Sequence, residues 1–358
     1  MTLDLDPGSA GIGNAQLVQA IIAEMDGAAI PFERFMELAL YHPDHGYYRK
    51  PGRIGPDGDF LTSPHIHQLF GWAVAAWAHW SWEQLGRPGR FAIYEPGAGA
   101  GRLATAMLDW ATGRDREFAD AIDYIAIEPN NPGTEPRATW TMPPLEPADY
   151  GLVVSNEFFD ALPVRLFEGT PRGAQEIYVQ WNGSAFEETR GPIAVVEDAP
   201  QSGRFEVNAR AFPTMTELGQ LVRQGAVLTF DYGYPREELW APWRTQGTLL
   251  CFYRHTAHEN PYIHVGDQDI TAHVDFTDLE AALDASEFET FGPVSQTSFL
   301  LALGAQQLVD AARQELQEYF TRRRALEELT DSAGLGRVRV LAGLRGIEST
   351  PPGFEETA

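Results

Sequence analysis

The sequence predicts an α/β protein built on a mainly parallel β-sheet. Between residues 91 and 342, short apolar runs alternate with segments of helical spacing. Runs of this kind are typical of strands that are buried on both faces of a sheet. The first run also ends in a glycine-rich turn that leads into a helix, as in nucleotide-binding folds. The expected strands cover residues 91–94, 124–127, 152–155, 226–230, 288–291 and 338–342.

Helical spacing marks most of the remaining chain. Residues 15–25 and 32–41 predict two amphipathic helices. Residues 68–85 predict a long helix, rich in Trp and Ala, that is closed by Gly86 and Pro88. Residues 302–329 predict one long helix or a helix pair. Between residues 164 and 212 the pattern breaks into short β-like pieces at 176–181 and 205–208, which we interpret as a β-rich insertion.

Composition limits the classes of partner. The 358 residues carry 51 acidic and 26 basic side chains, a formal net charge of −25, which argues against nucleic acid as a partner. No apolar run approaches the ~18 residues of a transmembrane helix, and the N-terminus lacks a basic-then-apolar signal pattern. The single cysteine, Cys251, fits a reducing compartment. We therefore expect a cytoplasmic protein without membrane insertion.

The turn after the first apolar run is the most informative segment. Glu95 ends the run, and helical spacing resumes at Leu103. Between them stand the alternating glycines Gly97, Gly99 and Gly101. Glycines there let the backbone turn sharply and approach a ligand, which the start of the next helix can also bind. Dinucleotide-binding proteins and methyltransferases both use such a turn, so the turn alone leaves the ligand open.

Polar residues at the strand ends favour S-adenosylmethionine as this ligand. Glu95 can hold the amino group of the methionine part, and Glu128, after the next run, can accept hydrogen bonds from a ribose diol. A third run is followed by Asn156, Glu157 and Asp160. The two acids could grip a guanidinium group, which pairs well with carboxylates. Helix caps or solvated loops are the alternative explanation for each acid.

Several longer motifs resemble the MidA family of class I methyltransferases, over about residues 30 to 343. Three of them are Gly-Asp-Phe-Leu-Thr-Ser-Pro at 58–64, Asn-Glu-Phe-Phe-Asp-Ala-Leu-Pro at 156–163 and Asp-Ile-Thr-Ala-His-Val-Asp-Phe at 269–276. The other segments are 30–32, 35–36, 39–43, 46–48, 230–234, 247–249 and 299–304.

The resemblance implies a Rossmann-like class I methyltransferase core with a mainly parallel seven-stranded sheet and S-adenosyl-L-methionine as cofactor. Mitochondrial members of the family assist respiratory complex I assembly and methylate a protein arginine. The resemblance therefore implies a protein substrate, such as a respiratory-complex subunit. The residues assigned to cofactor binding are Asp59, Thr62, Glu95, Gly97, Gly99, Gly101, Glu128 and Asn156. Those assigned to catalysis are Glu157, Asp160 and His273, and none is assigned to a metal.

These assignments define expected domains. A helical cap and a cofactor-covering loop should span residues 1–90, and the methyltransferase core residues 91–345. The insertion at about 165–212 is expected on the substrate side, and a flexible tail at 346–358. The covering loop has a simpler alternative, a helix entry that Ser63 caps with Pro64 in the first turn.

Alternation along the extended segment 269–275 would place four polar side chains on one face. They are Asp269, Thr271, His273 and Asp275. A structural, hydrogen-bonded His273 is the alternative to a catalytic one.

Departures from the family pattern keep other functions open. His65-Ile66-His67 stand where the family has Glu-Ile-Ser, and Ala98, Ala100 and Arg102 replace the non-glycine members of the turn. The proline-rich segment 129–136 forbids a long helix after Glu128. A small-molecule O- or N-methyltransferase and a non-catalytic assembly protein that retains the fold are the alternatives. A metal held by His65, His67 and Asp59 is a further one, and a homodimer is compatible with the sequence.

Overall fold

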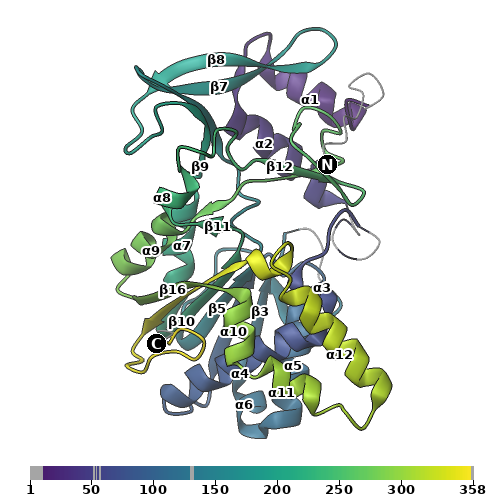
Figure 1. Ribbon diagram of the computed structural model, residues 1–358, viewed down its shortest axis with the longest axis vertical. Helices are drawn as coiled ribbons and strands as arrows, with labels where there is room; N and C mark the ends of the chain where they lie inside the picture. The colour runs from purple at the N-terminus through teal and green to yellow at the C-terminus, as the bar shows by residue number, and fades with distance from the viewer. Residues whose placement is uncertain (1–10, 51–52, 54, 56–57, 130–132, 356–358) are drawn as a thin grey trace. The chain divides into compact units, whose positions relative to one another are not determined.

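The computed structural model describes residues 11–50, 53, 55, 58–129 and 133–355 (Figure 1). The chain divides into two compact units, each assembled from three separate stretches. The first unit comprises Met1–Leu61, Phe159–Ala211 and Tyr234–Asp275. The second comprises Thr62–Phe158, Phe212–Gly233 and Phe276–Ala358.

The second unit is built on a seven-stranded sheet in the order β16-β17-β10-β5-β2-β3-β4. Strand β17 is antiparallel to both of its neighbours, and the other pairs are parallel. The mainly parallel seven-stranded sheet is therefore confirmed. The strands are β2 (Phe91–Pro96), β3 (Ile122–Ile127), β4 (Thr139–Thr141), β5 (Ala148–Asn156), β10 (Val222–Asp231), β16 (Glu289–Ser295) and β17 (Arg339–Arg345).

Helices cover this sheet because its central strands are apolar on both faces. Every residue of β2 is buried, and the side chains of α4 (Gln68–Gln84) and α5 (Arg102–Arg114) join the same core. A Cβ on Gly71 would overlap the Cβ of Ala106, so a glycine lets α4 and α5 approach closely. The other helices of this unit are α3 (Ser63–Ile66), α6 (Arg116–Ala121), α9 (Phe276–Ala285), α10 (Gln296–Ala302), α11 (Ala305–Asp310), α12 (Leu316–Leu329) and η2 (Leu335–Arg337).

The first unit combines short helices with small antiparallel sheets. A five-stranded sheet has the order β1-β7-β6-β9, with β8 paired to β7, and a three-stranded sheet has the order β13-β12-β14. The helices and first strand are α1 (Ala15–Met25), α2 (Phe32–Tyr41), η1 (Tyr47–Arg49), α8 (Arg236–Leu239) and β1 (Ile30–Pro31). The other strands are β6 (Arg165–Thr170), β7 (Gly173–Trp181), β8 (Phe186–Ala194), β9 (Gly203–Val207), β12 (Leu250–Tyr253), β13 (Thr256–His258) and β14 (Asp269–Thr271).

Three elements lie at the divisions between the units. They are α7 (Ala211–Gly219), β11 (Gly233–Tyr234) and β15 (Val274–Asp275). The β-rich character expected for residues 165–212 is confirmed, since this stretch contains β6 to β9.

Two of the expected boundaries differ from the structure. The expected cap over residues 1–90 is divided after Leu61, because Phe70, Trp77 and Trp82 of α4 are buried in the core of the second unit. The tail expected to be flexible from residue 346 packs instead, as far as it is described, since Ile347 and Phe354 are buried in the same core. Residues 356–358 lie outside the described residues.

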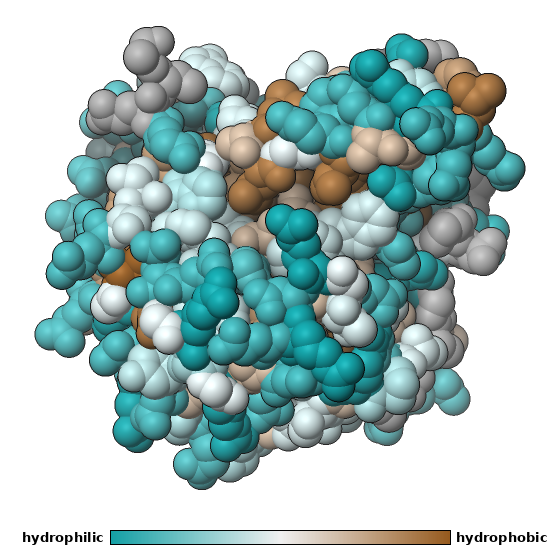
Figure 2. Space-filling model, turned by 90° about the horizontal axis from the view of Figure 1, so that it is seen from below, coloured by the Kyte–Doolittle hydropathy of each residue, from teal (hydrophilic) through white to brown (hydrophobic). Residues whose placement is uncertain are grey.

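One face of the molecule is mostly polar. The face shown in Figure 2 is mostly hydrophilic, with hydrophobic residues in small groups between polar ones. Among the described residues, no helix has both the length and the apolar character that crossing a membrane requires.

Candidate active site

The glycine turn lies where the sequence predicts it, between the end of β2 and the start of α5. Gly97, Gly99 and Gly101 all have positive φ, at 69°, 53° and 78°. Residues other than glycine rarely adopt positive φ angles, so the turn depends on glycine. Gly101 is the N-cap of α5, whose first N–H groups have no partner within the helix.

The three glycines have different surroundings. A Cβ on Gly97 would lie 3.1 Å from the ring of Phe158, and one on Gly101 would lie 2.9 Å from the ring of Trp140. A Cβ on Gly99 would meet nothing closer than the carbonyl oxygen of Gly97, at 4.0 Å. Gly97 and Gly101 therefore make room for the protein's own aromatic rings. Gly99 faces open space, where a ligand can approach the backbone.

Glu95 is a buried carboxylate at the end of β2. It is 5% exposed, and its Oε2 accepts a hydrogen bond from the hydroxyl of Tyr124 at 2.7 Å. Burial and, to a smaller degree, the negative charge of Glu128 raise the pKa of Glu95 to about 8, against the lowering effect of the Tyr124 hydrogen bond. A cation placed beside Glu95 would stabilise the ionised carboxylate.

The sequence alone did not predict that Tyr124 donates a hydrogen bond to Glu95, although the register of β2 and β3 could have indicated it. Tyr124 pairs with Ile93 across β2 and β3, and Ile93 shares a face of β2 with Glu95. Tyr124 therefore points to the same side of the sheet as the acid.

Glu128 follows β3 and reaches the glycine turn. Its Oε2 accepts a hydrogen bond from the backbone N–H of Gly99 at 3.1 Å. This contact places the carboxylate over the open glycine. The long helix that the proline-rich segment was expected to forbid is absent from residues 128–129 and 133–138, and residues 130–132 lie outside the described part of the chain.

Asn156 ends β5, and Glu157 follows it at the same edge of the sheet. The side-chain amide of Asn156 donates to Oε1 of Glu157 at 3.0 Å. The other polar atom of Asn156, Oδ1, is buried and accepts no hydrogen bond from any described residue. A buried acceptor without a donor carries a free-energy cost that a ligand N–H or O–H group would relieve.

The backbone of Glu157 is held in a rare conformation. Its φ is 49°, in the left-handed region that costs a non-glycine residue free energy. Neighbouring residues fix it: the N–H of Glu157 donates to the carbonyl of Phe230 at 2.8 Å, and Asp231 Oδ2 accepts from the N–H of Phe158 at 3.1 Å. Asp231, which is fully buried, is a positioning residue that the sequence alone did not indicate.

Thr62 and His65 flank Ser63, whose N–H donates to Oε1 of Glu157. Oγ1 of Thr62 and Nδ1 of His65 lie 2.8 Å apart in a hydrogen bond, and burial together with the charge of Arg102 lowers the pKa of His65 to about 4. His65 is therefore neutral at pH 7. Thr62, not Ser63, is the N-cap of α3, and the Ser63 hydroxyl donates to Gln296 at 2.9 Å. The alternative of Ser63 as a helix cap is wrong.

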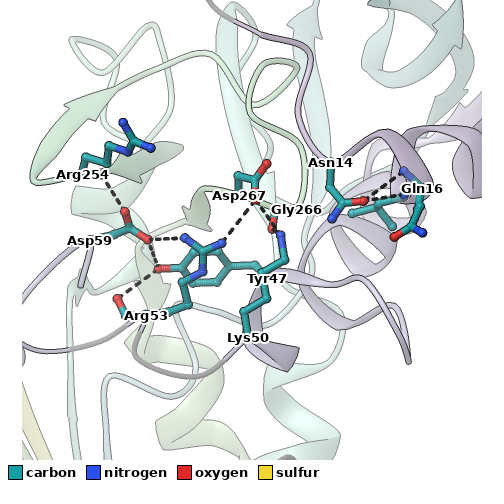
Figure 3. A network of polar contacts seen from close by, with 10 residues as sticks. Asn14, Gln16, Tyr47, Lys50, Arg53, Asp59, Arg254, Gly266 and Asp267 are labelled. Atoms are coloured by element: carbon teal, nitrogen blue, oxygen red, sulfur yellow. Dashed lines mark hydrogen bonds and ion pairs between the residues drawn. The ribbon is translucent and has the colours of Figure 1, made fainter. Parts of the chain in front are cut away.

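Asp59 belongs to a polar network of the first unit (Figure 3). One carboxylate oxygen accepts from the backbone N–H of Arg254 at 2.6 Å, and the other accepts from the hydroxyl of Tyr47 at 2.9 Å. Arg53 Nη1 lies 3.6 Å from this second oxygen. These contacts give Asp59 a structural function, and its predicted contact with the cofactor stays a prediction.

Asp160 and His273 also belong to the first unit. The carbonyl of Asp160 accepts from the N–H of Ala272 at 3.0 Å, and the N–H of His273 donates to Thr248 Oγ1 at 3.0 Å. The ring of His273 lies 5.4 Å from that of Tyr234. The catalytic roles of Asp160 and His273 stay predictions.

The single polar face expected for residues 269–275 stays a prediction. Strand β14 ends at Thr271, so His273 lies outside it. The acids at the two ends have different partners: Asp269 accepts from Tyr48, and Asp275 pairs with Arg236 at 2.7 Å. Among the residues that the structure describes, no group of three or more His, Cys, Asp or Glu side chains is placed to hold a metal ion.

The residues at the end of the sheet fit S-adenosylmethionine. Glu95 would hold its ammonium group and Glu128 its ribose hydroxyls, Gly99 allows close approach, and Asn156 Oδ1 can accept a further hydrogen bond. When bound, the cofactor supplies a methyl group on a positively charged sulfur. The fold and this edge of the sheet define a Rossmann-like methyltransferase of class I.

Comparison with known proteins identifies the family. Residues 73–294 match the model of a family of S-adenosyl-L-methionine-dependent methyltransferases, and the chain belongs to this family. It is therefore an S-adenosylmethionine-dependent methyltransferase. A crystal structure of a protein from Burkholderia thailandensis bound to S-adenosyl-homocysteine is 30% identical, with a TM-score of 0.88 over 95% of each chain.

Two curated relatives carry names that specify an acceptor. The chain is 29% identical to protein arginine methyltransferase NDUFAF7 of Mus musculus, over 77% of this chain and 71% of the relative. It is 26% identical to the NDUFAF7 homolog of Drosophila melanogaster, over 94% of this chain and 86% of the relative. Both relatives are named mitochondrial.

Proposed function

We propose that this protein transfers the methyl group of S-adenosylmethionine to an arginine side chain of a partner protein. The observation that carries the proposal is Glu157, a carboxylate in a strained backbone conformation directly after the strand β5. Backbone strain of this kind concentrates at functional sites. The names of the curated relatives support arginine as the acceptor.

Hydrogen bonds from neighbouring residues orient the carboxylate of Glu157. Its Oε1 accepts from the Asn156 amide at 3.0 Å and from the N–H of Ser63 at 3.4 Å. A guanidinium group has five N–H donors and would pair with the carboxylate through charge-assisted hydrogen bonds. Holding a guanidinium nitrogen in line with the methyl group would supply most of the rate acceleration. A carboxylate can also accept the proton that the methylated nitrogen releases.

A labelled-methyl assay on a lysate, separated into protein and small-molecule fractions, tests the acceptor class. We expect the label on arginine residues in the protein fraction. Glu157→Gln should lower transfer at least ~30-fold, because it removes the charge that pairs with the guanidinium. Asp149→Asn changes an exposed carboxylate on β5, the strand that Glu157 follows, and is the matched control that should retain full activity. Label confined to small molecules would support the small-molecule alternative instead.

The absence of any transfer despite cofactor binding would support the non-catalytic alternative. The cytoplasmic location also belongs to this proposal, and fractionation of the source cells would test it. The single cysteine, Cys251, is buried and reduced, which is compatible with a reducing compartment.

A further inference from the structure

The first unit contains a half-buried arginine, Arg244, whose side chain has no hydrogen-bond acceptor among the described residues. Its Cζ lies 4.7 Å from the ring centroid of Tyr234 and 4.7 Å from that of Trp243. Its Nε is buried, whereas its two Nη groups are accessible to solvent. Contact with aromatic rings stabilises the positive charge but leaves the N–H donors without an acceptor. A ligand with two oxygens can therefore reach the Nη groups.

The backbone around Arg244 is held in place by neighbouring segments. The N–H of Arg244 donates to the carbonyl of Ala241 at 2.8 Å, and the carbonyl of Thr245 accepts from the N–H of Arg204 at 2.9 Å. A Cβ on Gly203 would lie 2.9 Å from the Cα of Thr245, so a glycine allows this close approach. The position of Arg244 is thus fixed before a ligand binds, which lowers the entropic cost of binding.

Two other arginines of the same unit have a carboxylate where Arg244 has none. Arg165 lies over the ring of Phe167 at 4.8 Å, and its Nη2 is 2.8 Å from Glu176. Arg236 lies over a tryptophan ring at 5.2 Å, and its Nε is 2.7 Å from Asp275. Each combines an aromatic contact with an ion pair. The chain has 51 acidic residues, yet none of those described pairs with the third arginine.

We propose that Arg244 and Trp243 bind a carboxylate side chain, of Asp or Glu, on the protein that accepts the methyl group. This assignment rests on the proposed function. The two Nη groups would donate parallel hydrogen bonds to the two carboxylate oxygens. Trp243, which is 69% exposed, would pack against the same segment of the acceptor protein. Arginine and tryptophan are enriched among the residues that dominate binding at protein interfaces.

The charge of the site favours a carboxylate over a phosphate group. A single guanidinium neutralises a single carboxylate, whereas a phosphate group carries a charge of about −1.5 to −2 at pH 7. Arg244 is the basic side chain that the described contacts place at these two rings. The site therefore fits an acidic side chain of a protein, and inorganic phosphate serves as a probe that can contradict this assignment.

NMR on the full chain tests the site without turnover, by following the side-chain N–H signals of Trp243 and Arg244. The probes are the peptide acetyl-Gly-Glu-Gly-amide and its glutamine analogue, which has nearly the same shape but no charge. The glutamate peptide should shift these signals and bind at least ~10-fold more tightly than the glutamine peptide. Equal binding of the two peptides, or no binding of either, would overturn the proposal. Binding of inorganic phosphate as tight as that of the glutamate peptide would overturn the choice of a carboxylate.

Three variants separate binding from folding and from a general effect of charge. Arg244→Gln should abolish the preference for the glutamate peptide, and Arg244→Lys, which keeps the charge but not the paired donors, should lower it at least ~3-fold. Arg172→Gln removes an exposed arginine of the same unit, between β6 and β7, and should keep the preference. An unchanged preference in both Arg244 variants contradicts the proposal, as does an equal loss in Arg172→Gln.

The labelled-methyl assay distinguishes this site from the proposed function. Transfer to lysate protein at limiting concentration should fall at least ~5-fold in Arg244→Gln and recover at saturating concentration, because the site acts in binding. Label on protein arginine that Arg244→Gln leaves unchanged would reject this site and leave the proposed function standing. Binding of the glutamate peptide without any label on protein arginine would reject the proposed function, and with it the methyl acceptor as the source of the carboxylate.

Discussion

Two buried glutamates of the second unit, Glu95 and Glu135, have opposite electrostatic surroundings. Both are at most 5% exposed. The guanidinium of Arg137 donates to both oxygens of Glu135, and these hydrogen bonds lower the pKa of Glu135 to about 2. Glu95 has a tyrosine hydroxyl where Glu135 has an arginine, and its pKa is raised to about 8.

The difference shows that burial does not by itself reveal what a carboxylate does. An acid whose charge the protein neutralises stabilises the fold, and Glu135 is of this kind. An acid that is buried with only neutral donors is suited to a cation from outside, as the ammonium group of S-adenosylmethionine would be. Substituting Glu95 and Glu135 in turn tests this difference.

The largest expected effect follows from removing the charge at Glu95. Glu95→Gln should lower the affinity for S-adenosylmethionine about 100-fold, because the amide cannot pair with the ammonium group. Calorimetry measures this directly. Glu135→Gln is the matched control and should keep the affinity of the folded protein within about threefold. An unchanged affinity in Glu95→Gln would remove Glu95 from the cofactor site.

The next effect is a dependence of stability on pH. The pKa of Glu95 is raised from 4.5 to about 8 in the folded protein, so the folded state holds this proton more tightly than the unfolded chain does. The corresponding stability is fully present below pH 4.5 and is lost as the pH rises through 8. Without ligand, the free energy of unfolding should fall by on the order of 3 kcal/mol between pH 5 and 8 through this group.

Urea unfolding of the unaltered protein and of Glu95→Gln checks this sign. Glu95→Gln should lack the pH-dependent contribution of Glu95. The free energies of unfolding of the two proteins, plotted against pH, should therefore converge at low pH and separate at high pH. Glu135 has the opposite sign: its lowered pKa contributes stability that is present above pH 4.5 and is lost as the pH falls toward 2. Parallel profiles of the two proteins would show that Glu95 does not titrate in this range.

A smaller effect is expected at Glu135 itself. Glu135→Gln should lower the free energy of unfolding by about 1.5 kcal/mol, because it replaces charge-assisted hydrogen bonds to the half-exposed Arg137. Urea unfolding at pH 7 measures it. Asp109→Asn removes the exposed partner of the same arginine and should cost less than about 0.5 kcal/mol. Equal losses in both variants would contradict a special contribution of the buried acid.

The smallest effect concerns Tyr124. Its hydroxyl favours the ionised form of Glu95, so Tyr124→Phe should make ionisation harder and weaken S-adenosylmethionine binding about fivefold. Tyr94→Phe is the control, since the hydroxyl of Tyr94 donates to the carbonyl of Glu146 instead, at 2.6 Å. Similar losses in both variants would argue against the specific hydrogen bond to Glu95.

Much of the fold could be predicted because its signals are local. Each expected strand of the main sheet lies within or next to an observed strand, since an apolar run buried on both faces is visible in the sequence. The positions of Gly97, Gly99 and Glu128 at strand ends were predictable for a similar reason, and their contacts with the cofactor stay predictions. The division into units was not predictable in this way, since the position of α4 depends on which core its apolar face joins.

The residues that act through others were harder to predict. Tyr124 and Asp231 influence the site through contacts between strands, and such contacts need the register of the sheet. His273 was grouped with Asp269 by alternation along one strand. The strand ends at Thr271, and the next N–H, of Ala272, donates to the carbonyl of Asp160. Local periodicity cannot show where a strand ends in this way.

Each unit is made of three separate stretches of the chain, and this has a consequence for engineering and for evolution. The chain passes between the units near residues 61, 158, 211, 233 and 275, so neither unit is a continuous segment that one cut could separate. Thr62, Glu157 and Asp160 each lie within two residues of such a passage. Exchanging one unit for a homologous one would therefore rejoin the chain beside the predicted chemistry, so cofactor site and acceptor site are expected to diverge by substitution rather than by domain exchange.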